Sequence, residues 1–227
     1  YLWYRDGKVT TTRYFEATFK PDESLTLDKA VDEIEAVFED SVNAHKISDV
    51  EVGCFLSSGV DSSYVSTYFA DQKTFTVGFD FGDHYNEISW AKRLSEKIGV
   101  DHHTKLIGSD EFWGAVPKVQ YQMDQPLADP SCIALYFVSK LASKYVKVVL
   151  SGEGADELFG GYPWYHNHEI LFDDCFPWSK SQDIRRSILK DGVLKNGEEY
   201  VRQRYLDTIS LAPKLKSDTD LDRRMRE

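Results

Sequence analysis

Between residues 50 and 150 the sequence alternates between short apolar runs and longer segments whose apolar residues recur with helical spacing. Such alternation favours a parallel sheet, because each strand is connected to the next through a right-handed helical crossover. The expected strands are 50–56, 74–79, 102–107 and 146–150, and the expected helices are 61–70, 87–98, 110–123 and 131–145. We therefore expect an α/β fold, a three-layer open parallel sheet with helices on both faces.

The segments on either side of this alternating region have other patterns. Residues 1–20 predict a β-hairpin, because Asp6-Gly7 is a strong two-residue turn signal between two β-prone runs. An amphipathic helix is expected at 26–45. Beyond residue 162 no strand is expected, only helices at 183–189, 198–209 and from 221 onward. The predicted domains are a hairpin at 1–20, an α/β core at 21–162 and a helical extension at 163–227.

Composition narrows the classes of function. The 227 residues carry a formal net charge of −11, and an acidic domain is a poor partner for nucleic-acid phosphates. No apolar run approaches the length of a transmembrane helix and no signal peptide is recognised, so we expect no membrane partner and a cytoplasmic protein. The three cysteines, Cys54, Cys132 and Cys175, form no CxxC pair, which fits a reducing compartment. Cys54 lies within an expected strand, and we expect it in the core.

The loop after the first expected strand has the composition of a phosphate-binding loop. Residues 57–63 read Ser-Ser-Gly-Val-Asp-Ser-Ser, which offers small residues, hydroxyls and free backbone N–H groups ahead of a helix N-terminus. These groups favour a phosphate or pyrophosphate. The loop lacks the lysine and the spacing of a Walker loop, and it is not GxGxxG. A tight strand–helix turn that binds nothing is the alternative.

A second loop follows the last expected strand and carries acids. Residues 147–162 read KVVLSGEGADELFGGY, so a β-branched run ends abruptly in glycines and delivers Glu153, Asp156 and Glu157 close together. Clustered carboxylates repel one another unless a cation or a substrate ammonium neutralises them. In an open α/β sheet, ligands bind at the carboxyl ends of the strands. The segment therefore predicts an active site that faces a cation.

Together the two loops resemble the synthetase domain of the glutamine-hydrolysing asparagine synthetases, which belong to the ATP pyrophosphatase (PP-loop) superfamily. Residues 57–62 are similar to that superfamily's SGGxDS pyrophosphate loop, with Ser58 in place of one of its two glycines. A serine can still donate from its backbone there, unless the position requires a positive φ. The resemblance implies a fold of the adenine nucleotide alpha hydrolase-like type, and it extends more distantly to the β-lactam synthetases.

Three further stretches agree with the resemblance. Residues 74–79 are similar to the family's second strand. Residues 85–87 open the next helix as the family's acidic pair does, with Asn86 in place of the usual Asp. Residues 123–126 are similar to the family's Asp-Glu-Pro turn, with Gln125 in place of Glu. The two matched loops stand in the family's order at the ends of two strands, which makes the resemblance specific as far as residue 162.

The resemblance implies an ATP-dependent carbon–nitrogen ligase. ATP would convert the side-chain carboxylate of aspartate to β-aspartyl-AMP with release of pyrophosphate. Ammonia, made from glutamine by a separate glutaminase domain, would then displace AMP to give asparagine. The implied cofactors are ATP and Mg²⁺, and the implied partners are the small-molecule substrates and the glutaminase domain. Two alternatives are a β-lactam-synthetase-like ring closure and a non-catalytic ATP-binding module.

The resemblance also implies roles for individual residues. Glu153 would be the catalytic residue that positions or deprotonates the attacking ammonia, and Asp61 and Asp156 would bind Mg²⁺. Glu157 either acts at the site or is an acid that favours a helix N-terminus. The implied nucleotide-binding residues are Leu56, Ser57, Ser58, Gly59, Val60, Asp61, Ser62, Val77, Gly78, Ser151 and Gly152.

Within this set, the first loop would hold the β and γ phosphates. Leu56, Val77 and Gly78 would border the adenine and ribose. Ser151 and Gly152 would meet the AMP portion.

The family pattern has parts that the printed sequence does not show. Full-length members begin with a glutaminase domain whose N-terminal cysteine attacks glutamine, and residues 1–20 would be the end of that domain or the linker after it. A late lysine of the family, which would stabilise charge on the α phosphate, has no counterpart here. We therefore expect a fragment that binds ATP weakly and turns over poorly or not at all by itself. The sequence leaves open whether the protein forms a homodimer.

Overall fold

The computed structural model describes residues 1–15, 22–82, 86–125, 129 and 131–163, with single positions at 187, 203 and 207. The chain divides into two compact units, one of residues 26–158 and one of residues 1–25 with 159–227. The helices expected at 183–189, 198–209 and from 221 onward lie outside the described residues, apart from those single positions. Cys175 also lies outside them.

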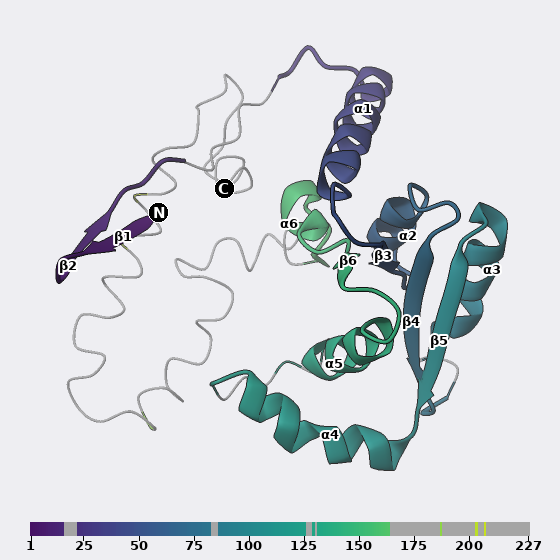
Figure 1. Cartoon of the computed structure of the whole chain (residues 1–227). Coiled ribbons are helices and arrows are strands. Elements are labelled where there is room, and N and C mark those ends of the chain that lie inside the picture. Colours follow the sequence, from purple (N-terminus) through teal and green to yellow (C-terminus); the bar gives the residue numbers. More distant parts are fainter. Residues whose placement is uncertain are drawn as a thin grey trace. The chain divides into compact units, whose positions relative to one another are not determined.

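The unit of residues 26–158 is built on a four-stranded parallel sheet (Figure 1). Its strands are β3 (Val52–Phe55), β4 (Lys73–Phe79), β5 (Asp101–Ile107) and β6 (Val148–Leu150). Their spatial order is β5-β4-β3-β6, so β6, which comes last along the chain in this sheet, pairs with β3, which comes first. Cys54 stands in register with Thr74 of β4 on one side and with Leu150 of β6 on the other. The predicted parallel sheet is confirmed.

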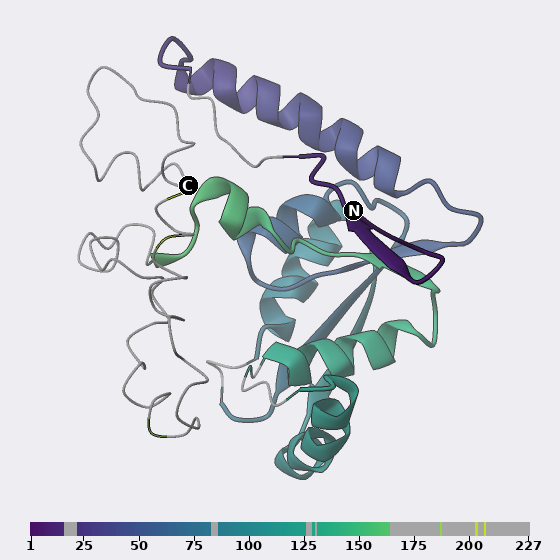
Figure 2. The ribbon, with the colours of Figure 1, turned by 90° about the vertical axis from the view of Figure 1, so that its left-hand side faces the viewer.

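Helices cover both faces of this sheet. The helices α1 (Leu27–His45), α2 (Val60–Ser66) and α3 (Ile88–Ile98) lie on one face. The helices α4 (Ser109–Gln122) and α5 (Ser131–Ala142) lie on the other, and Figure 2 shows them opposite α1. The short helix α6 (Ala155–Phe159) follows β6. The predicted three-layer α/β arrangement is confirmed, and the helix expected at 61–70 ends earlier, at Ser66.

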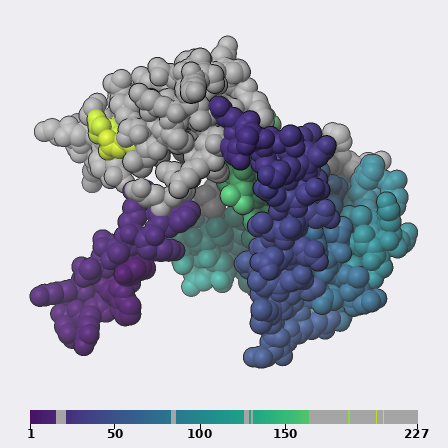
Figure 3. Space-filling view, turned by 90° about the horizontal axis from the view of Figure 1, so that it is seen from above, coloured from purple at the N-terminus to yellow at the C-terminus, as the bar shows by residue number. Residues whose placement is uncertain are grey.

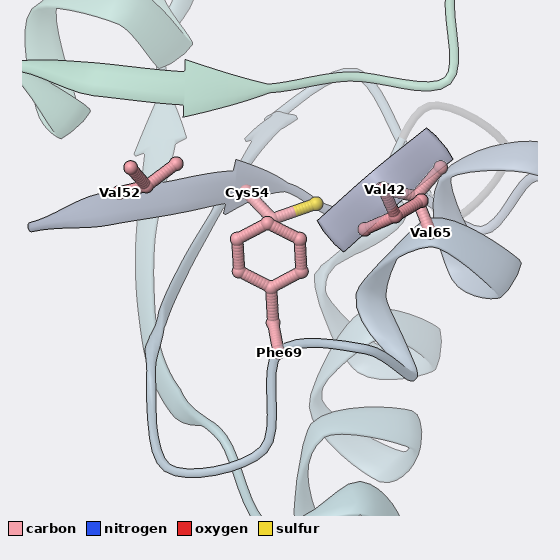
Figure 4. Packing of buried hydrophobic residues seen from close by; sticks show 5 residues of the cluster. All are labelled: Val42, Val52, Cys54, Val65 and Phe69. Carbon is pink, nitrogen blue, oxygen red and sulfur yellow. The ribbon is translucent and has the colours of Figure 1, made fainter. Parts of the chain in front are cut away.

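One core cluster lies between the sheet and the first two helices. Val52 and Cys54 of β3 pack against Val42 of α1, and Val65 and Phe69 complete the cluster (Figure 4). Cys54 is fully buried, as expected, and burial raises the pKa of its thiol to about 12. The thiol therefore remains protonated at neutral pH and behaves as a small core side chain.

The core on the opposite face is larger, because two helices pack there. Phe75 of β4 is fully buried against α5, while its neighbours Thr74 and Thr76 face the other side of the sheet. Gly53 of β3 makes room for Phe75, since a Cβ atom at Gly53 would lie 2.7 Å from the ring. The remaining buried residues of this face are Ile107, Ala115, Val119, Ile133, Phe137, Leu141, Ala142 and Val146.

The second unit contains the predicted hairpin. Strands β1 (Leu2–Arg5) and β2 (Lys8–Thr11) pair antiparallel around Asp6 and Gly7. Both turn residues have a positive φ, 51° and 75°, which is the type I′ turn that an Asp-Gly pair predicts. Every residue of the two strands is exposed, and Figure 3 shows their atoms in purple.

No helix in the described part of the chain combines the length and the apolar character that crossing a membrane requires.

Candidate active site

The two loops singled out in the sequence lie at neighbouring strand ends. Because β6 pairs with β3, with Leu150 opposite Cys54, the loops that follow these strands leave the sheet side by side. Gly152 sits against the first turn of α2. A Cβ atom at Gly152 would lie 2.8 Å from the backbone nitrogen of Ser62 and 2.9 Å from the Cβ of Asp61. Only glycine allows this approach without a shift of the backbone, so the structure brings the two predicted loops into contact.

The first loop is held in shape by its own serines. The hydroxyls of Ser57 and Ser62 are 2.6 Å apart. The backbone N–H of Ser57 donates to the Ser62 hydroxyl at 3.0 Å, and the N–H of Gly59 donates to the Ser57 hydroxyl at 3.1 Å. The Ser62 hydroxyl can in turn donate to the carbonyl of Gly59 at 3.3 Å. The network closes on itself, so the loop has a fixed shape before any ligand binds.

The helix behind the loop presents unused donors. Gly59 is the N-cap of α2 and has no side chain that could accept a hydrogen bond. Within the described part of the chain, no acceptor is found for the N–H groups of Val60, Asp61 and Ser62. These donors stand at the positive end of the helix dipole, a setting that favours an anion.

Ser58 causes no backbone strain where the superfamily pattern has glycine. The non-glycine residues with a positive φ in the described chain are Asp6, Asp71 and Asp124. Ser58 is not among them, so the position does not require glycine. The substitution therefore leaves the backbone donor in place.

The residues expected to border the adenine and ribose lie at the ends of β3 and β4. Leu56 is only 2% exposed, its N–H donates to the carbonyl of Phe75 at 2.9 Å, and its carbonyl accepts from the Thr76 hydroxyl. Val77 is half-buried. Gly78 is buried under the start of α3, where a Cβ atom would lie 2.5 Å from Oδ1 of Asn86.

The second loop turns sharply before its acids. The N–H of Glu153 points to the Ser151 hydroxyl at 3.5 Å, and Gly154 has a φ of +92°, which favours glycine. Helix α6 then begins at Ala155, and Asp156 and Glu157 occupy its first turn. The side chain of Glu153 is exposed, and Asp156 is half-buried. The acids therefore stand near solvent, where a substrate can reach them.

The carboxylates of this edge suit a magnesium ion that is shared with phosphate. No group of three or more His, Cys, Asp or Glu side chains within the described ranges could hold a metal by itself. Mg²⁺ commonly takes only one or two carboxylates and completes its shell with waters and substrate phosphates. Asp61 and Asp156, the two residues predicted as ligands, fit that requirement.

One residue at the first loop received no role from the sequence. The N–H of Ser58 donates to Oε2 of Glu87 at 3.3 Å. Glu87 is the residue that precedes α3, and next to it Oδ1 of Asn86 accepts from the N–H of Ile88 at 3.2 Å. Residues 85–87 resemble the helix start at which the family has an acidic pair, with Asn86 in place of Asp, but only the fold shows which loop the Glu87 carboxylate faces.

Comparison with known proteins identifies the family. Residues 33–226 match the family model described as asparagine synthase. The chain is 46% identical over 164 residues to asparagine synthetase (glutamine-hydrolyzing) 1 of Bacillus subtilis, a match that covers 70% of this chain and 26% of that protein. It is 30% identical over 223 residues to asparagine synthetase (glutamine-hydrolyzing) 3 of the same organism, covering 89% of this chain and 36% of that protein.

A solved structure of NH3-dependent NAD synthetase from Campylobacter jejuni aligns with 85% of this chain and 99% of its own, at 13% identity. Its TM-score of 0.38 is too low to support an argument about the fold. The family match itself extends past residue 162, where the motif resemblance ends, and it covers most of the sequence. The chain therefore belongs to the asparagine synthase family.

Proposed function

We propose that this chain is the ATP-using part of an enzyme that makes asparagine from aspartate. The observation that carries the proposal is the contact of Gly152 with Asp61 and Ser62, which joins a phosphate-type loop to a loop that carries acids. A carboxylate is a poor electrophile, because its negative charge repels nucleophiles. A site that brings a polyphosphate and a carboxylate together can convert that carboxylate to an acyl adenylate.

The first loop would hold the β and γ phosphates of ATP. Its fixed shape means that little conformational entropy is lost when the phosphates bind. The N–H groups of Val60, Asp61 and Ser62 would donate to phosphate oxygens, as donors at helix N-termini commonly do. The hydroxyls of Ser57 and Ser62 stand at the same edge.

Asp61 and Asp156 would hold Mg²⁺ at this edge. When bound, the ion would supply a positive charge that screens the triphosphate from the carboxylate substrate. The two residues come from different loops, Asp61 from the start of α2 and Asp156 from the start of α6. The contact of Gly152 with Asp61 supports this assignment, because it brings the two loops together.

The rest of the nucleotide would lie along the ends of the strands. Val77 and Gly78 would border the base and ribose, together with the backbone of Leu56. Leu56 is buried, so its side chain supports this surface from behind. Ser151 and Gly152 would meet the AMP portion, since they lead from β6 toward Asp61.

Glu153 would act in the second half of the reaction. It would accept a hydrogen bond from the attacking ammonia and orient it, or take its proton as the new carbon–nitrogen bond forms. An exposed carboxylate on a turn can reach a substrate without a loss of core packing. Glu157 would either assist it or stabilise the first turn of α6.

The proposal also needs a source of ammonia. The relatives are named as glutamine-hydrolyzing, and the chain spans about a quarter of the length of the first of them. We infer that a glutaminase domain supplies the ammonia, and that residues 1–20 connect to it. Residues 21–162 would be the synthetase core.

The proposal is tested by exchange of labelled pyrophosphate into ATP, measured on this chain and on the full-length gene product with a panel of carboxylate substrates. We expect exchange by the full-length protein that requires both Mg²⁺ and aspartate, and little by this chain alone. Exchange that is stimulated by an N-carboxyethyl amino acid and not by aspartate would favour ring closure instead. ATP binding without exchange for any carboxylate would indicate a non-catalytic module.

A further inference from the structure

The N–H groups of three consecutive residues in the first loop are all occupied, although no ligand is bound. Two of the acceptors, the hydroxyls of Ser62 and Ser57, belong to the loop itself. The third is different: the N–H of Ser58 donates to a carboxylate oxygen of Glu87, 29 residues further along the chain. Within the described ranges this is the one charged acceptor on the loop. A negative charge therefore sits where a phosphate-binding loop receives its ligand.

The position of Glu87 is fixed by the packing of its neighbours. On one side of it, Oδ1 of Asn86 accepts a hydrogen bond from the N–H of Ile88, the first residue of α3. The start of α3 approaches β4 closely, because Gly78 has no Cβ atom; one placed there would lie 2.5 Å from the Asn86 side chain and 3.0 Å from Ile88. The backbone at Glu87 is thus held beside the loop, while its side chain is exposed and free to rotate away.

Carboxylate and phosphate oxygens compete for the same donor. Both are anionic acceptors that form short, strong bonds to backbone N–H groups. A phosphate oxygen that binds at the N–H of Ser58 must displace Glu87. The displaced carboxylate remains nearby, because its backbone is held by the packing at Gly78, and it then repels the phosphates.

We propose that Glu87 is a built-in competitor for the phosphate site, which occupies the N–H of Ser58 while the loop is empty and selects for polyphosphate that carries a divalent cation. This inference rests on the proposed function of the loop. The selection follows from charge. Metal-free pyrophosphate meets Glu87 with its full negative charge, whereas the magnesium complex has part of that charge neutralised. Glu87 therefore weakens binding of the metal-free ligand more than binding of the magnesium complex.

The test is a calorimetric titration of the full chain with pyrophosphate, in the presence and in the absence of Mg²⁺. The variant is Glu87→Gln, whose amide oxygen can still accept from Ser58, so the shape of the loop is retained while the charge is removed. The matched control is Glu96→Gln, an exposed carboxylate near the other end of the same helix. Because removing a like charge a few ångströms away at a protein surface is worth about a tenfold change in affinity, we expect Glu87→Gln to bind metal-free pyrophosphate about tenfold more tightly.

The two conditions and the control separate the outcomes. With Mg²⁺ present, the gain from Glu87→Gln should fall to about threefold or less, and Glu96→Gln should match the wild type in both conditions. Equal gains with and without Mg²⁺ would overturn the selection for the cation complex. Unchanged or weaker binding by Glu87→Gln would overturn the competitor role while leaving the phosphate loop intact. If neither the wild type nor the variant binds pyrophosphate, the proposed function of the loop fails, and this inference fails with it.

Discussion

The two loops at the carboxyl edge of the sheet are built in opposite ways. The loop after β3 is closed by hydrogen bonds among Ser57, Gly59 and Ser62. The loop after β6 turns through a positive-φ glycine and ends in acids that stand near solvent. The first loop has the rigidity that suits repeated binding of one group, a polyphosphate. The second has charge and access, which suit chemistry on a small substrate.

The largest effect on activity is expected from a change in the second loop, which carries Glu153. Glu153→Gln in the full-length enzyme should lower the rate of asparagine formation by about 10²- to 10⁴-fold, the usual contribution of a positioned acid or base. Aspartate-dependent exchange of pyrophosphate should persist, because Glu153 is assigned to the ammonia step. Stability should not change, because the side chain is exposed.

Glu157→Gln is the matched comparison for this experiment. A similar loss of asparagine formation would place Glu157 at the site with Glu153. A small change in stability with full activity would indicate a helix N-terminal acid. If Glu153→Gln instead abolished exchange, the assignment of Glu153 to the ammonia step would be wrong.

The contact between the loops is tested by Gly152→Ala. The new Cβ would lie 2.8 Å from a backbone atom of α2, so the backbone must move. We expect a loss of about 1–3 kcal/mol in the free energy of unfolding, as for other overpacked sites, together with weaker ATP binding. Urea unfolding and a nucleotide titration measure the two effects.

Gly114→Ala in α4 is the control for this substitution. A Cβ there meets nothing within 4 Å, and alanine is the better helix former by about 0.5–1 kcal/mol. Gly114→Ala should therefore stabilise the protein. Equal behaviour of the two variants would show that the loops are not in contact.

The closed network of the first loop is tested by Ser62→Ala. This change removes the acceptor of the Ser57 N–H and the hydroxyl partner of the Ser57 side chain. The expected loss is about 1 kcal/mol in the free energy of unfolding, with a fall in pyrophosphate affinity. Ser63→Ala, which removes only a bond to the Gly59 carbonyl, should have a smaller effect on affinity. If both variants lost the same affinity for pyrophosphate, the hydrogen-bond network of Ser57, Gly59 and Ser62 would not be what holds the loop in shape.

The smallest effect, a change in stability with pH, is expected at the amino ends of the strands, which lie away from the two loops. Near the amino end of β5, burial lowers the pKa of His102, with a further lowering from His103 and a partial offset from Asp101. The folded state thus binds fewer protons at this residue than the unfolded state, so stability should fall as pH decreases below the unfolded value near 6.5. The uptake of one proton changes the free energy of unfolding by at most about 1.4 kcal/mol per pH unit.

His102→Gln removes that titration, and it should flatten the dependence of the free energy of unfolding on pH between 7 and about 5. Pyrophosphate binding at neutral pH should be unchanged, because the residue is remote from both loops along the strand. A loss of binding in this variant would show that the two edges of the sheet are coupled.

The fold was largely predictable from the sequence, because its signals are local. Helical spacing and β-branched runs placed the strands and helices, and Asp6-Gly7 specified its own turn. The helix expected at 61–70 ends at Ser66 in the structure, and the cause is a contact in the tertiary fold. Phe69 must reach the core, and the chain passes from α2 into a series of tight turns at Thr67, Tyr68 and Phe69 that deliver it there.

The contact between the two loops was harder to predict from the sequence. Nothing local shows that β6 pairs with β3, and only that pairing explains why Gly152 must be glycine. The resemblance implied a shared site, but the contact of Gly152 with Asp61 and Ser62 comes from the fold. Glu87 was missed for the same reason, since its partner lies 29 residues away. A carboxylate at a helix start has an ordinary local explanation, so no local pattern connects Glu87 with the first loop.

The most direct test of the account asks whether the two loops hold one Mg²⁺–ATP. Aspartate-dependent exchange of pyrophosphate would be measured for the full-length protein with Asp61→Asn, Asp156→Asn and both changes together. If both carboxylates serve the same ion, each single change should reduce exchange strongly, and the double change should cost little more than the worse single one. Losses that multiply independently, or exchange that survives both changes, would contradict the claim that the loops form a single site.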